Sequence, residues 1–379
     1  MATQEYKPTR IMITTSHRLN ILSGAKDVLY AAFEECEVLA DEIPAAKRAR
    51  MEYYDGAIVR MQGPGNVTDW QSFKGPTVVI NNMLRDVPYP QVLSDDRAIG
   101  RMAAEYFLRR GFRHFVYAGD KSGFGTLRGE GFVEKLAETG IRDVPCPPPS
   151  SSNQIVPIRE LLARHPGEPV AAFCCNDWRA HALISVARML GIKCPRDLAV
   201  MGVDNDHVPS ICSHVSISTV EPPDYEIGRQ AADLVVSMLR GETAPAQPIL
   251  IPPIGVISRE SSDRYATRDP MLQRAVRFIE ANMQRSISVE DIARGAGRNV
   301  TLRTLQRRFR QAFGMTLVDA LLHARVERVK TLLAAGNLSI KEIAYVSGFA
   351  SPSHLSTTFH RIEGMSPSDF RNRVKSGSR

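Results

Sequence analysis

The chain has 379 residues and a formal net charge of +7, with 48 lysines and arginines against 41 aspartates and glutamates. This length is too great for one typical domain, so at least two are expected. The opening MATQEYKPTR is polar, and no stretch is long and apolar enough to cross a bilayer, which predicts a cytoplasmic protein and no membrane partner.

The first two thirds of the chain alternate short apolar, β-branched runs with amphipathic helical stretches. This alternation predicts parallel sheets covered by helices, an α/β fold. Strands are expected at Arg10–Thr14, Cys36–Leu39, Gly56–Arg60, Pro76–Asn81, His114–Ala118, Val170–Cys174, Ala199–Gly202 and Ser216–Val220. Helices are expected between them, at Asn20–Phe33, Ile99–Arg109, Gly129–Glu138 and Arg179–Leu190. The Pro- and Ser-rich run Pro145–Ser152 predicts a loop.

All six cysteines lie in this part of the chain, and they show no C-x-x-C spacing. They are Cys36, Cys146, Cys174, Cys175, Cys194 and Cys212. Buried, reduced thiols are the expected state of such scattered cysteines. We therefore predict no disulfide framework, no metal site and no cofactor.

Several local patterns in this region follow one another at characteristic spacings. They are Ser94-Asp95-Asp96 with Gly100, Leu108-x-x-Gly111-Phe112-Arg113-His114, Arg128-x-x-Gly131-Phe132, Ala172-Phe173-x-x-Asn176-Asp177, Gly191-x-x-x-Pro195, Val200-x-Gly202-x-Asp204 and Ser218-Thr219-Val220. In order and spacing, residues 10 to 260 resemble the ligand-binding domain of LacI-type repressors and the periplasmic sugar-binding proteins. The resemblance implies two doubly wound lobes, with a ligand site at the carboxyl ends of the strands.

The same resemblance implies which side chains meet the ligand. The ligand-binding candidates are Asp95, Arg128, Asn176, Asp177, Trp178 and Asp204. Carboxylates, amides and a guanidinium suit a sugar, because sugar hydroxyls both donate and accept hydrogen bonds. The implied effector is a monosaccharide such as D-xylose. Ser16, His17 and Arg18, in the first strand-to-helix loop, are further candidates.

Each candidate also has a structural interpretation. Asp177 and Asp204 are placed to cap the helices that follow them. Asp95 and Arg128 are types common on surfaces, and Trp178 is of a type that more often packs than binds.

The C-terminal third begins a different pattern. An apolar face recurs at helical spacing, and after Gly297 a second helix is expected from a cap at Thr301 to Phe313. The apolar face is formed by Ile287, Val289, Ile292, Ala293 and Ala296. The inward residues of the second helix are Leu302, Leu305, Phe309 and Phe313, and the exposed ones are Arg303, Thr304, Gln306, Arg307 and Arg310. Arg and Gln are the side chains that read guanine and adenine edges.

A similar helix pair follows at 340–371. Ile340, Ile343, Ala344 and Val346 form its first apolar face, Gly348 supplies the turn, and Ser351 with Pro352 opens the second helix. Leu355 and Phe359 are expected inside, whereas the outward residues are Ser353, His354, Ser356, Thr357 and His360.

Both pairs are helix-turn-helix motifs and resemble those of AraC/XylS-family transcription regulators. The second pair fills most fixed positions of the family pattern, namely Ile343-Ala344, Gly348-Phe349, His354, Gly364 and Pro367. It departs at Leu355, where Phe is usual, and at His360, where Lys or Arg is usual. The first pair departs by a longer turn around Arg298 and Asn299.

A long apolar pattern between the motifs resembles the rigid connecting helix of that family, ending near Gly336-Asn337. The apolar residues are Leu317, Leu321, Leu322, Val326, Val329, Leu332 and Leu333. In the family this helix sets the two motifs one turn of DNA apart. The resemblance implies DNA contacts from Arg303, Thr304, Gln306, Arg307, Ser351, Ser353, His354, Ser356 and Thr357.

The charge distribution agrees with this division. From Arg268 onward there are 19 basic and 9 acidic residues, whereas the preceding part has 29 and 32. A basic module suits phosphate binding, although solvated helix faces are also basic.

The sequence thus predicts a sensor domain (1–262), a linker (263–270) and an all-α reader domain (271–379). The predicted function is a sugar-responsive transcription activator of a carbohydrate catabolic operon, a homodimer associated with the nucleoid, whose partners are operator DNA and RNA polymerase. The alternative is a sugar-binding carrier. No dinucleotide, P-loop, metalloprotease or nucleophile-elbow pattern supports an enzyme: Gly295-Ala296-Gly297 lacks the third glycine of a dinucleotide fingerprint.

Overall fold

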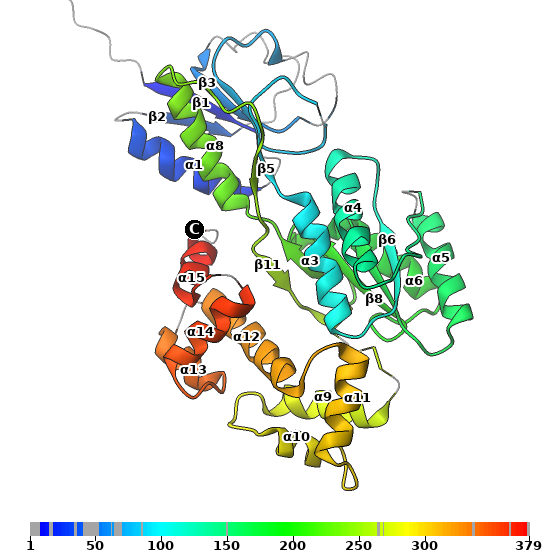
Figure 1. The fold of residues 1–379 in the computed structure, drawn as a ribbon. Coiled ribbons are helices and arrows are strands. Elements are labelled where there is room, and N and C mark those ends of the chain that lie inside the picture. Colours follow the sequence, from blue (N-terminus) through cyan, green and yellow to red (C-terminus); the bar gives the residue numbers. More distant parts are fainter. Residues whose placement is uncertain are drawn as a thin grey trace, which may run out of the picture.

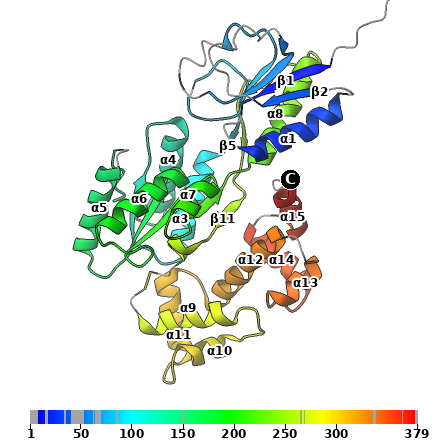
Figure 2. The same ribbon diagram turned by 180° about the vertical axis from the view of Figure 1, so that it is seen from behind.

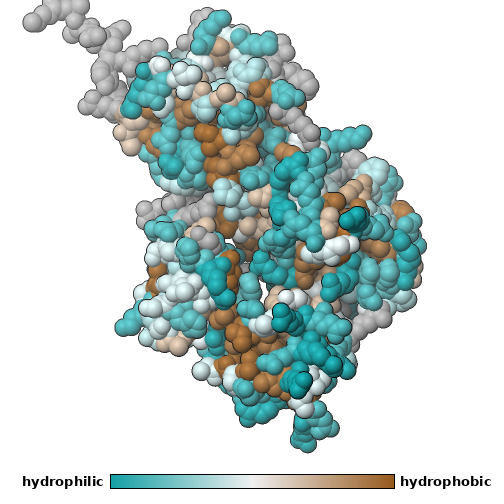
Figure 3. All heavy atoms as spheres, in the orientation of Figure 1, coloured by the Kyte–Doolittle hydropathy of each residue, from teal (hydrophilic) through white to brown (hydrophobic). Residues whose placement is uncertain are grey.

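The computed structural model describes residues 8–14, 18–33, 36–40, 53–61, 63, 70–84, 86–148, 151–263, 266–267, 269–335, 338–363 and 365–376. Two α/β lobes form the sensor domain, and the helical reader domain lies beside them (Figures 1 and 2; Figure 3 shows the same arrangement with all heavy atoms as spheres). The predicted fold class is confirmed. No helix within these ranges is both long and apolar enough to cross a membrane.

The first lobe is built on a parallel sheet of strand order β2-β1-β3-β4. Its strands are β1 (Thr9–Ile13), β2 (Cys36–Ala40), β3 (Gly56–Val59) and β4 (Thr77–Val79). Helices α1 (Leu19–Ala32) and α8 (Asp224–Leu239) lie side by side against it, although they are far apart in sequence (Figure 1). Their apolar residues share one core with those of the sheet.

The second lobe has a sheet of order β11-β9-β8-β7-β6, in which only β11 runs antiparallel to its neighbour. Its strands are β6 (His114–Ala118), β7 (Val170–Cys174), β8 (Leu198–Val203), β9 (Ser218–Glu221) and β11 (Gly255–Ile257). Its helices are α3 (Asp96–Arg109), α4 (Gly123–Ala137), α5 (Ser151–Arg164), α6 (Asp177–Met189) and α7 (His207–Cys212). Every residue of β8 is buried, because helices cover both faces of the sheet.

The chain passes between the lobes at three places. It leaves the first lobe after β5 (Val92–Ser94), returns between β9 and α8, and leaves again after β10 (Ile249–Ile251). Strands β5 and β10 pair in parallel, so two of the crossings lie side by side. The lobes are therefore joined by three segments of the chain rather than by one flexible linker.

Helices α3 and α4 approach each other closely because each helix has a glycine at the contact. A methyl group at Gly100 would lie 2.0 Å from the carbonyl oxygen of Arg128, and one at Gly131 would lie 2.1 Å from that of Arg97. Only glycine permits this approach at both positions. The contact places Arg128 of α4 beside the first turn of α3.

The reader domain consists of α9 (Pro270–Asn282), α10 (Val289–Ala296), α11 (Leu302–Phe313), α12 (Leu317–Ala335), α13 (Ile340–Val346), α14 (Pro352–Glu363) and α15 (Pro367–Ser376). It has two cores, one under α9 to α11 and one under α13 to α15. The long helix α12 belongs to both, since Leu321 lies in the first core and the adjacent Leu322 in the second.

The predicted strands and helices are present, with shifts of a few residues at their ends. Helices α5 and α7 fill intervals between predicted strands, as expected, whereas no range was predicted for β5, β10, β11, α8, α9 or α15. The predicted loop Pro145–Ser152 is wrong at its end, because Ser151 and Ser152 already belong to α5. The residues Gly336, Asn337 and Gly364 lie outside the described ranges.

The reader contacts the sensor at several places, among them α15 against α1 of the first lobe. The Arg113 Nη2 group donates to the carbonyl oxygen of Ala312 at the end of α11, at 3.2 Å. Farther along, Ile254, between β10 and β11, packs against the second reader core. Thus the second lobe, a segment that joins the lobes and the first lobe each contact the reader.

A Gly100→Ala substitution tests the close approach of α3 and α4. The added methyl group has no room, so the helices must separate, and we expect a loss of about 1–3 kcal/mol of stability. Thermal denaturation measures it. The control is Gly63→Ala, because no atom of the described residues lies within 4 Å of a methyl group there. Equal stability of the two variants would contradict the proposed packing constraint.

Candidate ligand site between the lobes and candidate DNA-binding surface

An ion-paired cluster spans the two lobes. Arg18, immediately before α1, places Nη1 at 2.8 and 2.9 Å from the two carboxylate oxygens of Asp224. Its Nη2 lies 2.6 Å from Oδ1 of Asp204, which follows β8 in the second lobe. Because Arg18 belongs to the first lobe, its pair with Asp204 bridges the lobes.

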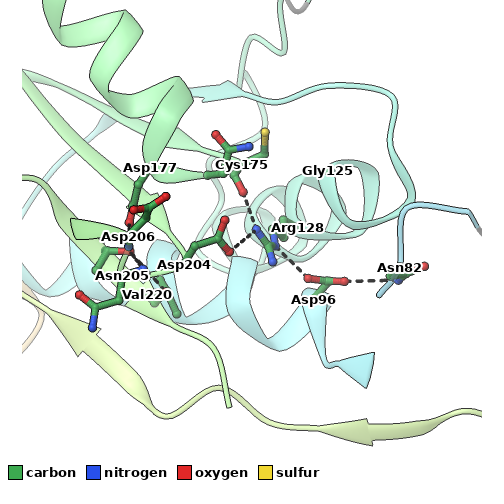
Figure 4. A network of polar contacts seen from close by, with 12 residues as sticks. Asn82, Asp96, Gly125, Arg128, Cys175, Asp177, Asp204, Asn205, Asp206 and Val220 are labelled. Carbon is green, nitrogen blue, oxygen red and sulfur yellow. Dashed lines mark hydrogen bonds and ion pairs between the residues drawn. The ribbon is translucent and has the colours of Figure 1, made fainter. Parts of the chain in front are cut away.

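Arg128 extends this cluster inside the second lobe. It is 5% exposed, and its Nε donates to Oδ1 of Asp96 at 2.8 Å. Its Nη1 donates to the carbonyl oxygen of Cys175 and lies 3.6 Å from Oδ1 of Asp204. Figure 4 shows the guanidinium between Asp96 and Asp204. We call Arg18, Asp96, Arg128, Asp204 and Asp224 the inter-lobe cluster.

The arginines of the cluster are held in their ionised forms, whereas burial raises the pKa of Asp96 and that of Asp224 although their arginine partners lower them. Burial by itself lowers the pKa of Arg18, but the nearby carboxylates of Asp204 and Asp224 outweigh it and raise that pKa. The same balance applies to Arg128, whose pKa is raised because Asp96 and Asp204 outweigh its burial. Buried charges are stable only when paired in this way.

Asp177, at the start of α6, lies beside this cluster and is also buried. It is 1% exposed, and its Oδ2 accepts the backbone N–H of Asp206 at 2.9 Å. Burial, followed by the charge of Asp204, raises the pKa of Asp177 to about 8. Near neutral pH this carboxyl therefore carries its proton, and the group both donates and accepts hydrogen bonds.

The backbone at the end of β8 is held in an uncommon conformation. Asp204 has φ 110° and Asn205 has φ 53°, and neither is glycine. Asn205 is fixed by Glu221, whose Oε1 accepts its amide at 3.1 Å, and by Arg259, which donates to its Oδ1 at 2.5 Å. Such strained positions concentrate at functional sites, because the surrounding contacts hold them there.

The predicted ligand residues have different fates. Arg128, Asp177 and Asp204 come together near the lobe junction, and Arg18 joins them. Asp95 and Asn176 instead cap helices: Asp95 Oδ1 accepts from the backbone N–H of Ala98 at 2.9 Å, and Asn176 Oδ1 accepts from that of Arg179 at 2.8 Å.

The structure also bears on the capping and packing interpretations of the candidate residues. Neither Asp177 nor Asp204 is an N-cap, since Asn176 caps α6 and Asp206 caps α7. Trp178 is 52% exposed, and its indole N–H donates to Asp206 at 3.0 Å, so it is not a core residue. Ser16 and His17 lie outside the described residues.

Sequence reasoning missed Asp96 and Asp224. Asp96 is next to the predicted Asp95, and only the helical geometry shows that the second acid turns inward while the first caps α3. Asp224 follows Pro222-Pro223, and its position in the first turn of α8 was a signal of an acid at a helix N-terminus.

The first candidate DNA-binding surface is the outer face of α11. Thr301 caps the helix as predicted, because its Oγ1 accepts the backbone N–H of Thr304 at 3.2 Å. Arg303, Gln306 and Arg307 are exposed and Thr304 is half-buried, whereas Leu305, Phe309 and Phe313 are buried. The predicted inward and outward faces of α11 are therefore observed.

The second candidate surface is α14. Ser351 caps it by accepting the backbone N–H of His354 at 3.1 Å, and the helix begins at Pro352. Ser353, His354 and Thr357 are exposed, and Ser356 is half-buried. One prediction for the preceding helix is wrong: Val346 is 41% exposed, and the buried face of α13 continues through Ser347 instead.

The two helix-turn-helix connections have the same length. Residues 297–301 join α10 to α11, and residues 347–351 join α13 to α14. The extra residues predicted for the first turn lie between Gly297 and Thr301, which caps α11. They do not lengthen the connection, because α10 ends directly before Gly297, whereas one residue, Ser347, separates the end of α13 from Gly348. The turn around Arg298 therefore does not lengthen the helix-to-helix connection.

The chain was compared with families of known proteins. Residues 104–262 match the periplasmic binding protein-like domain, and residues 295–373 match a helix-turn-helix domain. The chain is 26% identical over 333 residues to the xylose operon regulatory protein of Haemophilus influenzae, covering 84% of each. It is 27% identical over 298 residues to that of Escherichia coli K12, covering 75% of this chain and 74% of the relative.

Solved structures agree on the fold. A structure described as the xylose-binding transcription activator xylR matches with a TM-score of 0.59 at 23% identity, over 97% of this chain and 98% of that one. A transcriptional regulator CelR in complex with cellobiose matches with a TM-score of 0.53 at 21% identity, over 68% of this chain and 86% of that one.

The fold and these relatives define a class: the chain is a DNA-binding transcription regulator in which a periplasmic binding protein-like sensor precedes an AraC-type reader. Within that class it is similar to the xylose operon regulators, as the sequence pattern of sensor followed by reader predicts. The prediction of a sugar-responsive regulator is confirmed at this level, and the carrier alternative is not favoured. These relatives are named as regulatory proteins of the xylose operon.

An Asp177→Asn substitution tests the protonation of Asp177. The folded-state pKa of this acid is raised above its unfolded value near 3.8, so stability falls as pH rises from about 4 to about 8. One such group changes the unfolding free energy by at most about 1.4 kcal/mol per pH unit. Asparagine carries no charge, so the variant should lose less stability over this range. Denaturation between pH 5 and 8 measures both slopes, and parallel slopes would disprove the assignment.

Proposed function

We propose that this chain is a monosaccharide-responsive, XylR-like activator of a carbohydrate catabolic operon. The observation that carries the proposal is the Arg18–Asp204 pair, which links the lobes at the site where ligands bind in this fold. A ligand that replaces part of this pairing changes the energy of the closed arrangement. Ligand binding and lobe position are then linked.

The chemistry of the inter-lobe cluster suits a polyol. Its carboxylates accept hydrogen bonds, its guanidinium groups donate them, and the protonated Asp177 does both. A sugar hydroxyl also does both, and this mixture satisfies several hydroxyls at once. D-xylose is the first candidate, because the relatives of similar length are named for the xylose operon. We include Asp95, Asn176 and Trp178 as candidate contacts at its edge.

The contacts between sensor and reader supply a path for the signal. Ile254 lies in the crossing between β10 and β11 and packs on the reader core under α14. A methyl group at the adjacent Gly255 would lie 3.2 Å from Nζ of Lys330 on α12, and Lys330 pairs with Glu363 at 3.4 Å. A change in the crossing therefore changes surfaces that hold α12 and α14. A ligand shifts this equilibrium only by its preference for one arrangement.

The reader is proposed to bind operator DNA through the exposed faces of α11 and α14. The proposed contacts are Arg303, Thr304, Gln306, Arg307, Ser351, Ser353, His354, Ser356 and Thr357. A homodimer then meets paired half-sites and recruits RNA polymerase, and the protein acts in the cytoplasm at the nucleoid. The basic charge of the region from Arg268 onward supports phosphate contacts.

An Asp204→Asn substitution tests the ligand site. In the wild-type protein a ligand at about 100 times its Kd adds roughly 2.7 kcal/mol of stability, a shift of about 5–10 °C. The variant weakens both the Arg18 pair and the hydroxyl contact, so this shift should shrink markedly. The control is Asp233→Asn, which removes an exposed α8 carboxylate paired with Arg229. Absence of any shift with pentoses or hexoses in the wild-type protein would refute the sugar assignment.

An Arg307→Ala substitution tests the reader. If Arg307 reads a guanine, operator binding should weaken by about 1–3 kcal/mol and become less specific at that base pair. Fluorescence anisotropy with operator and scrambled duplexes measures the loss. Arg196→Ala, which changes an exposed arginine of the sensor, is the matched control. An equal loss on both duplexes assigns Arg307 to phosphate instead, and unchanged operator affinity removes it from the DNA surface.

A further inference from the structure

Three potential metal ligands meet at an edge of the second lobe, away from the inter-lobe cluster. His114 begins β6, His165 follows the last residue of α5, and Glu168 precedes β7. The Nε2 atom of His114 lies 2.7 Å from Oε2 of Glu168. The two imidazole rings are stacked, with centroids 3.8 Å apart and planes 20° from parallel. One ligand atom from each of the three residues lies within 4.8 Å of the other two.

The backbone under these side chains is fixed. His114 pairs with Val170 in the sheet. A tight turn holds the other two residues, because the N–H of Glu168 donates to the carbonyl oxygen of His165 at 3.0 Å. Gly167 has φ +79°, a left-handed conformation that glycine adopts readily. The three side chains therefore leave a rigid frame and need only rotate to converge.

The donor set has a definite chemical preference. Two imidazoles and one carboxylate are the ligands that zinc takes in sites with an open fourth position. At zinc–ligand distances of about 2.0–2.2 Å, tetrahedral ligand atoms lie roughly 3.4 Å from one another. The present separation of at most 4.8 Å is within the reach of side-chain rotation. The cysteine spacings in the sequence gave no sign of such a site, because none of its ligands is a thiolate.

We propose that His114, His165 and Glu168 form a site for a divalent transition-metal ion, with Zn²⁺ as the best match. The site lies beside the sensor–reader junction. Arg113, the neighbour of His114, donates to the carbonyl oxygen of Ala312 in α11. A small pocket at this place is lined by Arg113, His114, Glu168, Pro169, Ala266, Thr267 and Ala312. A bound ion ties the ends of α5, β6 and β7 together on the surface that supports the first helix-turn-helix motif.

The test uses the full chain without an affinity tag, carrying Cys146→Ser and Cys212→Ser so that these exposed thiols do not bind zinc. Equilibrium dialysis against ZnCl₂ with metal analysis should show one Zn²⁺ per chain, and saturating Zn²⁺ should raise the Tm. Loss of an outer partner of a ligand typically weakens metal binding about 10–100-fold, so His165→Ala, which removes a ligand, should weaken it by about 100-fold.

Two further variants make the result decisive. Glu168→Gln should also weaken zinc binding while keeping the metal-free Tm close to that of the parent, since it preserves the shape of an exposed side chain. His214→Ala, which changes an exposed histidine elsewhere on the second lobe, should bind zinc as the parent does. Failure of the parent to bind stoichiometric zinc, or equal binding by the parent and His165→Ala, would overturn the proposal.

Discussion

The ion pairs of Arg18, which join the lobes, are the interaction on which the rest of the structure depends. Arg18 is held by Asp224 on one side and by Asp204 on the other, and both partners come from distant parts of the chain. Charges that are partly removed from water are stable when they are paired. Removing one partner leaves the remaining charge unpaired, and this costs more free energy than the intact pair contributes. Arg18 thus connects the lobes through charge, and separating the lobes would expose these charges to water. An energy balance of this kind suits a protein that must change state for a small ligand.

The consequences of that balance reach the reader through ordinary packing. The loop after α3 supports the end of α11, and the crossing at Ile254 supports the core under α14. The first helix-turn-helix motif thus rests on the second lobe, and the second rests on a connection between the lobes and, through α15, on α1 of the first lobe. Movement of the lobes relative to each other does not act on the two supports equally. We propose that this inequality couples ligand binding to DNA binding, without a long chain of intermediate residues.

The parts of this architecture that were predictable are those encoded by local pattern. Continuous apolar runs marked the buried parallel strands, and Thr301 and Ser351 marked helix starts by their side-chain chemistry. The inward and outward faces of α11 followed from helical periodicity. The ligand site was only partly predictable, because a shift of one residue at a helix start exchanges a cap for an inward acid. Asp95 and Asp96 show this directly, since they are adjacent and have opposite roles. Asp224 pairs with a residue more than two hundred positions away, a relation that no local pattern encodes.

The shared helix α12 has a consequence for how operators evolve. Leu321 is fixed in one core and Leu322 in the other, so the two motifs of one chain cannot turn independently. Helix α12 therefore holds the two motifs at a constant separation. In the proposed DNA-binding mode, the stretch of DNA between the two major-groove contacts of a single chain keeps its length and helical phase across target promoters. Insertions into the DNA are then tolerated only between the binding sites of two chains, because a change in that interval does not require breaking the hydrophobic core of one chain.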